Sequence, residues 1–249
     1  MKSSGRKSGF SLIELLVVVG IISTLSVILL PSLGGAKEGA YSVSCLNNLH
    51  NLGFSMKIYH SDNQGEFWPF ALYNTPRAGV HAYFWGTNTD PVDTRPSPFM
   101  QYCDNLLASL WCPKQQWGSY VPQGGVSEPT TNYGYNAACL AGFGVPPKCE
   151  SDLNNPGELF VFADSGMYWA PGSVRIFQNS SYLEPVTGSG AGWSQTPTSH
   201  FRHKDKTYAL CADGHAGGFG LEGWIISGIY KDVDLGFVGT QNVPHYDQE

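Results

Sequence analysis

The sequence predicts an α+β fold in which one long N-terminal hydrophobic helix packs on a small antiparallel β-sheet head with long loops. An uninterrupted apolar segment at residues 10–30 is followed by apolar residues at three-to-four spacing, which is typical of a helix with one buried face. Beyond Gly65, Pro and Gly divide the chain into short segments rich in β-branched and aromatic residues. Charged residues make up only 14% of the chain, which favours a packed, loop-rich globule over a disordered chain.

The first predicted element is a membrane-spanning helix over residues 10–30. At about 1.5 Å of rise per residue it would be about 30 Å long, which matches the hydrocarbon core of a bilayer. Lys2, Arg6 and Lys7 precede it, so the positive-inside rule predicts a cytoplasmic N-terminus and an extracytoplasmic head. Glu14 is the only charged residue in the segment.

Glu14 distinguishes this segment from a plain membrane anchor. A carboxylate near the end of a membrane helix costs about 2–3 kcal/mol and usually has a partner. Cleavage between Gly9 and Phe10 would create an α-amino group four residues before Glu14, on the same face of the helix. The ion pair would form within one subunit or between neighbouring subunits; a protonated, unpaired carboxylate is the alternative. A signal-peptidase cut near Gly34 and Ala36 is disfavoured by the length of the apolar run.

The residues Gly9-Phe10-Ser11-Leu12-Ile13-Glu14 closely resemble the prepilin signature of type IV pilins and type II secretion pseudopilins. The resemblance implies a pilin-like fold, cleavage after Gly9 by a prepilin peptidase, methylation of Phe10, and a role of Glu14 in assembly. Pro31 lies where many pilins kink the long helix, because a proline removes a backbone donor.

The resemblance also implies what the protein does and where. It predicts a non-enzymatic structural subunit, a pseudopilin or minor pilin, of a type II secretion pseudopilus or a type IV pilus-like filament. Its partners would be the prepilin peptidase, other pilin or pseudopilin subunits, an inner-membrane assembly platform and membrane lipid. The subunit would cross the inner membrane once and later enter a periplasmic pseudopilus or a cell-surface filament.

These patterns divide the chain into a leader (1–9), a hydrophobic helix (10–30), an amphipathic continuation (31–61) and an extracytoplasmic head (62–249). The continuation carries an apolar stripe at Val43, Leu46, Leu49, Leu52, Phe54, Met56 and Tyr59. The segment Cys45–Pro69 resembles a phrase found in pseudopilin-like proteins where the long helix enters the head.

Strands are predicted in the head at Leu159–Ala163, Val174–Gln178 and Tyr208–Ala212. The last of these is followed by Asp213-Gly214 and His215–Phe219, which predicts a hairpin on a two-residue turn. A short helix is expected at Leu221–Tyr230.

The chain has six cysteines, and an even number in an exported protein predicts disulfides without defining their pairing. They are Cys45, Cys103, Cys112, Cys139, Cys149 and Cys211. Cys139 and Cys149 are the best candidates for a local bridge; free buried thiols are the alternative. No two cysteines form a CxxC pair, and none has zinc-finger spacing to histidines.

His203 and Asp213-Gly214 form an H-x9-DG pattern that resembles the C-terminal motif of a prepilin-like family. One interpretation makes His203 a general base oriented by Asp213, or makes both metal ligands. The favoured interpretation is structural, with Asp213 and Gly214 supplying positive φ angles for a turn and His203 bonding to nearby backbone. No nucleophile motif accompanies them.

Asp62, Asn63 and Glu66 place oxygen ligands on one tight loop, and the resemblance to major pseudopilins, which carry calcium, makes a structural calcium ion conceivable. The spacing does not match an EF-hand, and solvated turn residues need no metal. No other cofactor is predicted.

Seven tryptophans offer a second function class, a membrane-tethered or surface-displayed module that recognises glycans by stacking; core filling is the structural alternative. Nucleic acid is not an expected partner, because 14 Lys and Arg face 20 Asp and Glu, and the leader holds three of the basic residues.

Overall fold

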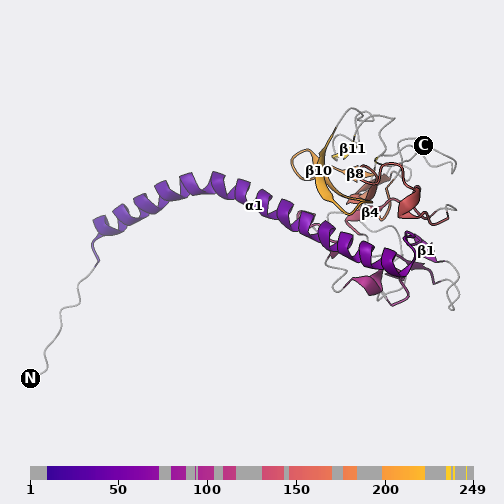
Figure 1. Cartoon of the computed structure of the whole chain (residues 1–249). Helices are drawn as coiled ribbons and strands as arrows, with labels where there is room; N and C mark the ends of the chain where they lie inside the picture. The colour runs from indigo at the N-terminus through magenta and orange to yellow at the C-terminus, as the bar shows by residue number, and fades with distance from the viewer. Residues whose placement is uncertain are drawn as a thin grey trace, which may run out of the picture. The chain divides into compact units, whose positions relative to one another are not determined.

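The computed structural model describes residues 10–72, 80–87, 93, 95–103, 109–115, 131–142, 146–169, 176–183, 198–221, 234–236, 238 and 245. The chain separates into two compact units, Met1–Ala40 and Tyr41–Glu249. One helix, α1 (Leu12–Asp62), contributes to both (Figure 1).

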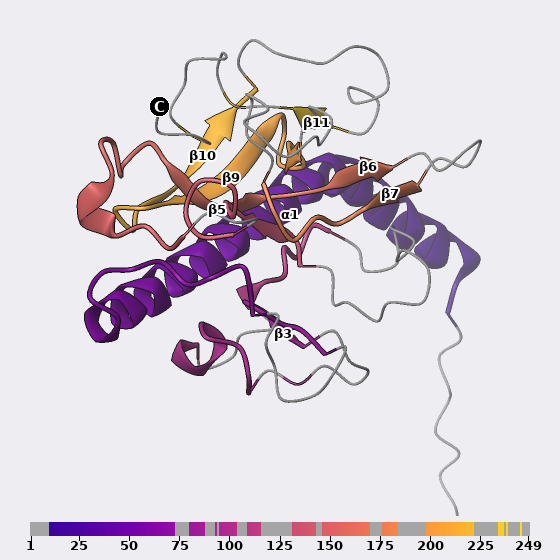
Figure 2. The same ribbon diagram turned by 90° about the vertical axis from the view of Figure 1, so that its right-hand side faces the viewer.

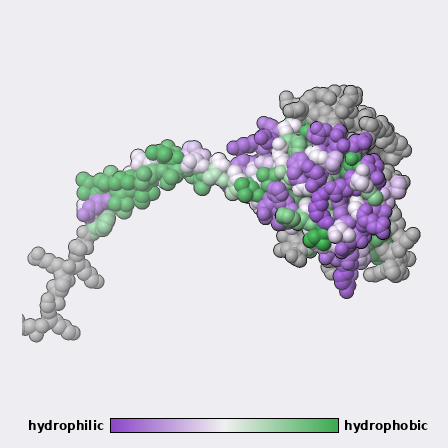
Figure 3. All heavy atoms as spheres, in the orientation of Figure 1, coloured by the Kyte–Doolittle hydropathy of each residue, from purple (hydrophilic) through white to green (hydrophobic). Residues whose placement is uncertain are grey.

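In the first unit, α1 is apolar on all its sides as far as Ala36, apart from Glu14. An 18-residue window of the helix has a mean hydropathy of 2.6, and none of that window is buried inside the protein. By length and composition the helix can therefore cross a membrane. Figure 3 shows the hydrophobic side chains gathered along this part of α1. Pro31 lies inside the helix.

The part of α1 in the second unit buries one narrow stripe. Cys45, Leu49, Leu52, Met56 and Tyr59 are buried and recur at alternating intervals of four and three residues. This spacing keeps them on one helix face.

Val43 and Phe54 do not belong to this stripe, and their predicted burial is wrong. Their side chains are 69% and 70% exposed. Each is two residues from a buried position, which is a rotation of about 200° around the helix axis. They therefore point away from the face that packs.

The stripe belongs to the core beneath a four-stranded antiparallel sheet with the strand order β10-β9-β5-β4. The strands are β4 (Tyr133–Tyr135), β5 (Phe160–Asp164), β9 (Lys206–Cys211) and β10 (Ala216–Gly220). The main core cluster joins α1 to Phe162 and Leu210 of the sheet, whereas Phe160 and Ala209 belong to a second cluster. Figure 2 shows α1 running along this sheet.

Three smaller sheets and two 3-10 helices complete the described head. They are β1 (Ala71–Leu72), β2 (Ala82–Tyr83) and β3 (Gly86–Thr87); β6 (Met167–Trp169) with β7 (Ile176–Gln178); β8 (Ser199–His200) with β11 (Leu235–Gly236); and η1 (Met100–Tyr102) and η2 (Glu150–Asp152). One long helix with small antiparallel sheets confirms the predicted α+β class. The expected helix at 221–230 lies, beyond Leu221, outside the described residues.

The β9–β10 hairpin is confirmed, but its turn differs from the expected one. The Gly214 N–H donates to the Cys211 carbonyl at 2.9 Å, and the Cys211 N–H donates to the His215 carbonyl at 2.8 Å. The loop therefore holds three residues, with a glycine in the left-handed region at its end. Gly214 has φ +97°, whereas Asp213 is not among the residues with positive φ. Only the glycine supplies the unusual angle.

The core of the head is built from stacked aromatic rings. Trp68 stacks on Phe99 with ring centroids 3.9 Å apart, and also on Tyr135 and Phe162. Trp68 and Trp85 are at most 1% exposed, so neither can stack on an external sugar. The side chains of Trp117, Trp169, Trp193 and Trp224 lie outside the described part of the head.

Candidate functional site

The N-terminal end of α1 is capped by its own glutamate. The Leu15 N–H donates to the Ser11 carbonyl at 3.2 Å, which makes Ser11 the residue that precedes the first turn. Glu14 Oε2 accepts the Ser11 N–H at 2.9 Å, which is one half of a capping box. The sequence reasoning missed this role, although the S-x-x-E spacing of Ser11 and Glu14 is its signal.

The Glu14 carboxylate lies among apolar side chains. Phe10, Ile13, Val17 and Val18 line a shallow surface pocket with it. Gly9, the residue on the other side of the expected cleavage site, lies outside the described residues.

Within the described residues, the apolar surface of this helix segment is exposed. The large hydrophobic side chains from Leu12 to Leu33 are 45% to 80% exposed. A helix that is apolar on all sides is stable only inside a membrane or inside an assembly of helices. A surface of this kind therefore calls for a membrane or neighbouring helices around it.

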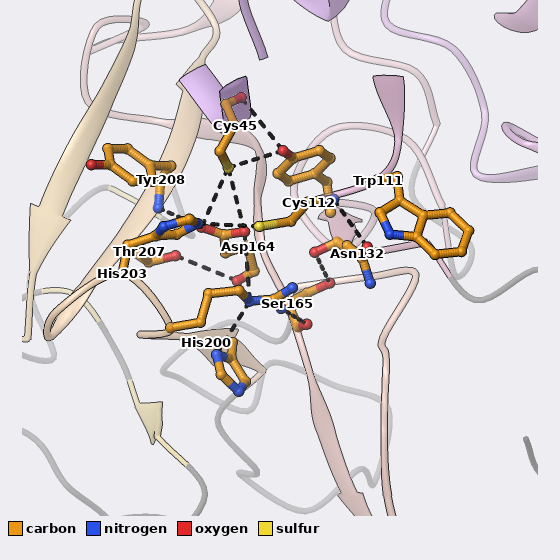
Figure 4. A network of polar contacts seen from close by, with 12 residues as sticks. Cys45, Trp111, Cys112, Asn132, Asp164, Ser165, His200, His203, Thr207 and Tyr208 are labelled. Atoms are coloured by element: carbon orange, nitrogen blue, oxygen red, sulfur yellow. Dashed lines mark hydrogen bonds and ion pairs between the residues drawn. The ribbon is translucent and has the colours of Figure 1, made fainter. Parts of the chain in front are cut away.

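A second candidate site lies inside the head, where four chemically reactive side chains meet. Cys45 comes from α1, Cys112 from the segment 111–115, Asp164 from the end of β5, and His203 from the turn before β9. All four are at most 2% exposed. One sulfur, oxygen or nitrogen atom of each lies within 4.8 Å of those of the other three (Figure 4).

Short polar contacts connect the four side chains. Cys112 Sγ lies 3.1 Å from His203 Nε2, and His203 Nε2 lies 3.7 Å from Asp164 Oδ2. Cys45 Sγ lies 3.8 Å from Asp164 Oδ1. The cluster is therefore a continuous polar network in an otherwise apolar core.

A surrounding layer of polar groups holds these side chains in place. The Tyr133 hydroxyl lies 2.9 Å from Cys45 Sγ, and the Tyr208 N–H donates to Asp164 Oδ2 at 2.9 Å. Arg202 Nε lies 3.7 Å from Asp164 Oδ1. The Cys112 N–H donates to Asn132 Oδ1 at 3.0 Å, which orients the cysteine.

Burial and the neighbouring charges shift the pKa of these groups in different directions. Burial raises the pKa of Asp164 to about 7; Cys112 adds to the increase, and Arg202 and His203 oppose it. Burial also raises the pKa of the Cys45 thiol. Burial acts in the same sense on Cys112, but hydrogen bonds with Cys45 and His203 outweigh it and hold the Cys112 pKa well below its usual range. Cys112 is thus the more acidic thiol.

The structure does not pair His203 with Asp213. His203 precedes β9 and Asp213 follows it. Since a strand rises by about 3.4 Å per residue, the length of β9 separates the two side chains. Asp213 Oδ1 instead lies 2.7 Å from Nδ1 of His215 at the hairpin end. The catalytic interpretation of that pair is therefore wrong, and the acidic neighbour of His203 is Asp164.

The structure does not contain the disulfides that we expected, since none of the six cysteines is bonded to another. The favoured local pair has other contacts: Lys148 Nζ donates to Cys139 Sγ at 3.7 Å, and the Cys149 side chain caps η2. Cys103 is half-buried beside η1, and Cys211 is buried in the second core cluster.

The loop considered for calcium makes contacts of its own. The Asn63 side-chain amide donates to the Tyr59 carbonyl at 2.8 Å, while Asp62 and Glu66 are exposed. The calcium site stays a prediction.

Comparison with known proteins identifies the N-terminal part of the chain. Residues 4–30 match the family model of the prokaryotic N-terminal methylation motif. The chain is also similar to type II secretion system core protein G of Vibrio cholerae serotype O1, with 28% identity over 48% of this chain and 71% of that protein. The same core protein of Klebsiella pneumoniae is 29% identical over 46% of this chain and 71% of its own length.

These matches support a pilin or pseudopilin family for the chain. The core protein G of Pectobacterium carotovorum is 27% identical over 47% of the chain and 67% of that protein. No solved structure gives a significant match. These matches leave about half of this pilin-like chain unmatched.

Proposed function

We propose that this pilin-like protein is a structural subunit of a type II secretion pseudopilus or a related filament. The observation that carries the proposal is the exposed apolar surface of α1, which is charged only at Glu14 as far as Ala36. A bundle of such helices from neighbouring subunits would bury this surface. The similarity to core protein G supports the same role.

Maturation would begin with cleavage after Gly9 by a prepilin peptidase and methylation of Phe10. The position of the methylation motif at residues 4–30 supports this step. Before assembly, α1 would hold the subunit in the inner membrane, with its N-terminus cytoplasmic and its head extracytoplasmic, as the basic residues of the leader indicate. An assembly platform would then move the subunit into the filament.

Glu14 would set the position of each subunit in the filament. Cleavage after Gly9 would leave a free amine at Phe10. Phe10 directly precedes Ser11, whose N–H donates to Glu14 Oε2. A carboxylate has two oxygens, so it can cap its own helix and also bind the amine of a neighbouring subunit. In lipid such an ion pair is weakly screened and strongly favoured over an unpaired charge.

Two substitutions at Glu14 separate the cap from the charge. Gln retains an acceptor for the Ser11 N–H but has no charge, whereas Ala removes both. We expect Glu14→Gln and Glu14→Ala to be cleaved normally, and each to reduce incorporation into filaments by about tenfold or more, which corresponds to about 1.4 kcal/mol. Cleavage is measured by intact mass, and assembly by the amount of chain in sheared filaments.

Glu14→Asp is the matched control, because it keeps the charge but shortens the side chain. It should retain more assembly than Glu14→Gln. Normal assembly of Glu14→Gln would contradict the ion pair and leave only the cap, while normal assembly of Glu14→Ala would contradict any role of Glu14 in the filament.

The similarity to pseudopilins favours a structural, non-enzymatic role. His203 and Asp213 lie at opposite ends of β9, which argues against the disfavoured catalytic interpretation of this pair. Trp68 and Trp85 are buried, so they are not available to stack on a glycan in the alternative function.

A further inference from the structure

The buried cluster of Cys45, Cys112, Asp164 and His203 is not explained by filament assembly. Four reactive side chains from four separate segments meet in the core, whereas apolar residues would fill the same space at lower cost. A buried polar cluster of this kind requires a compensating interaction.

We propose that Cys45, Cys112, Asp164 and His203 bind a structural zinc ion. The ligand types are those of zinc sites, with two sulfurs, one imidazole nitrogen and one carboxylate oxygen. Calcium and magnesium prefer oxygen ligands alone and would not select two cysteines.

The distances between the ligand atoms fit a tetrahedral ion. With metal–ligand bonds of about 2.0–2.3 Å, the corners of a tetrahedron lie about 3.3–3.8 Å apart. The structure places Asp164 Oδ2 3.9 Å from Cys45 Sγ and 3.7 Å from His203 Nε2, which lies 3.1 Å from Cys112 Sγ. All pairs of ligand atoms lie within 4.8 Å, so movements of about an ångström would complete the geometry.

The charges of the cluster also balance around a divalent ion. Two thiolates and the Asp164 carboxylate carry three negative charges, while zinc and the neighbouring Arg202 carry three positive charges. With a neutral His203, the buried group has no net charge, which removes most of the cost of burying it. Arg202 lies beside Asp164 Oδ1, where it would orient this metal ligand without binding the ion itself.

The surrounding hydrogen bonds suit deprotonated ligands. The Tyr133 hydroxyl, which is fully buried, lies within hydrogen-bonding distance of Cys45 Sγ and can donate to a thiolate. The Tyr208 N–H donates to the Asp164 carboxylate. Such donors fix the orientation of metal ligands and tune their affinity.

The site would be closed and structural. All four ligands come from the protein, and none is exposed to solvent. The zinc ion would therefore have no open coordination position for a substrate. Because Cys45 belongs to α1, the ion would tie the base of the helix to the sheet and loops of the head. The main rival is a disulfide between Cys45 and Cys112, which an oxidising compartment would favour.

Metal analysis of the full chain, purified in detergent without chelators, tests the proposal. We expect elemental mass spectrometry to find one zinc ion per chain. After denaturation in a chelator, we expect a thiol assay to find six free thiols. Replacement by cobalt(II) should give the intense visible absorption of a tetrahedral site and a thiolate-to-cobalt charge-transfer band. This spectrum needs no variant, so it remains decisive if a ligand substitution prevents folding.

Matched variants locate the ion. Cys45→Ser, Cys112→Ser and His203→Ala should lose zinc. Cys211→Ser, which changes a buried thiol outside the cluster, and His215→Ala, at the exposed hairpin end, should retain it. Tyr133→Phe should keep one ion but bind it about 10–100-fold more weakly, as measured by competition with a chelator.

Three results would overturn the proposal. One is a Cys45–Cys112 disulfide in the isolated protein, found by peptide mapping. Another is a reduced chain that neither contains nor takes up zinc. The third is full zinc content in the folded Cys45→Ser and Cys112→Ser variants, which would place the ion elsewhere.

Discussion

At the end of α1, His60 is buried against the ring of Phe67, with ring centroids 4.6 Å apart. Its Nδ1 lies 3.1 Å from Glu150 Oε2, and Lys57 Nζ lies 2.5 Å from the other oxygen of the same carboxylate. Burial lowers the pKa of His60, the contact with Glu150 opposes this shift, and Lys57 adds to it. The histidine is therefore neutral in the folded protein near pH 7.

This shift predicts how stability depends on pH. The unfolded chain binds a proton at His60 near pH 6.5, whereas the folded chain binds it only at lower pH. The contribution of a neutral His60 is therefore complete above about pH 6.5 and is lost as the pH falls towards the folded pKa. In thermal unfolding between pH 7.5 and about 5, we expect His60→Gln to lose less stability than the unchanged protein. Equal losses would contradict this assignment.

Glu150 acts in a different pH range. Its burial raises its pKa, but the hydrogen bonds from Lys57 and His60 outweigh burial, so the pKa lies below its usual value. Its contribution is present above the unfolded pKa, and is lost only as the pH falls from about 4.5 towards the folded value. Measurements above pH 5 therefore separate His60 from Glu150.

Gly214 is the residue whose backbone angle the hairpin requires. Its φ of +97° lies in a region that side chains disfavour, and an added Cβ would lie 3.1 Å from Lys57 Cε. We expect Gly214→Ala to lower the free energy of unfolding by about 1–2 kcal/mol. Gly220→Ala is the control, because Gly220 lies in β10 with nothing within 4 Å of an added Cβ. Chemical denaturation of both variants measures the difference, and equal stabilities would contradict the role of the backbone angle.

At the scale of elements, Gly53 is a position where α1 lies close to the β9–β10 hairpin. A Cβ at this position would lie 3.0 Å from Leu210 Cδ1 and 3.2 Å from the Gly214 carbonyl oxygen. The absence of a side chain at Gly53 therefore leaves room for the Leu210 side chain and for the backbone of the hairpin turn. Glycine in a helix interior lowers stability, and the close contact with the hairpin offsets this cost.

Gly53→Val should lower the free energy of unfolding of the head by about 1–3 kcal/mol, because the added methyl groups overpack this contact. Gly39→Val is the matched control in the same helix, since nothing lies within 4 Å of an added Cβ there. The control should be neutral or slightly stabilising. Denaturation of the two variants, followed by the tryptophan fluorescence of the core, provides the comparison; equal effects would show that the contact contributes nothing.

At the scale of the whole molecule, the proposed maturation would shorten the chain before assembly. We expect the intact mass of the protein from membranes to correspond to a chain that begins at Phe10 and carries one added methyl group. A chain that begins after Ala36 would instead show cleavage by an ordinary signal peptidase and contradict the proposed processing.

The elements were largely predictable, because their signals are local. The helix shows apolar residues at helical spacing, β5 and β9 are rich in β-branched, aromatic and other apolar residues, and the Asp213-Gly214 turn signal predicted the hairpin that contains β10. The misassigned Val43 and Phe54 show the limit of this reasoning. A spacing of three to four residues allows several neighbouring stripes, and only packing on the sheet selected the one that starts at Cys45.

The sequence by itself determined the N-terminal helix, its lone Glu14 and the α+β class, since a contiguous motif and a local periodicity carry that information. Only the tertiary structure brought Cys45 to Asp164, 119 residues apart, and Cys112 to His203, 91 residues apart. No short spacing encodes contacts between segments that fold from distant parts of the chain. For the same reason, the H-x9-DG spacing suggested Asp213 as the partner of His203, whereas the sheet placed Asp164 there.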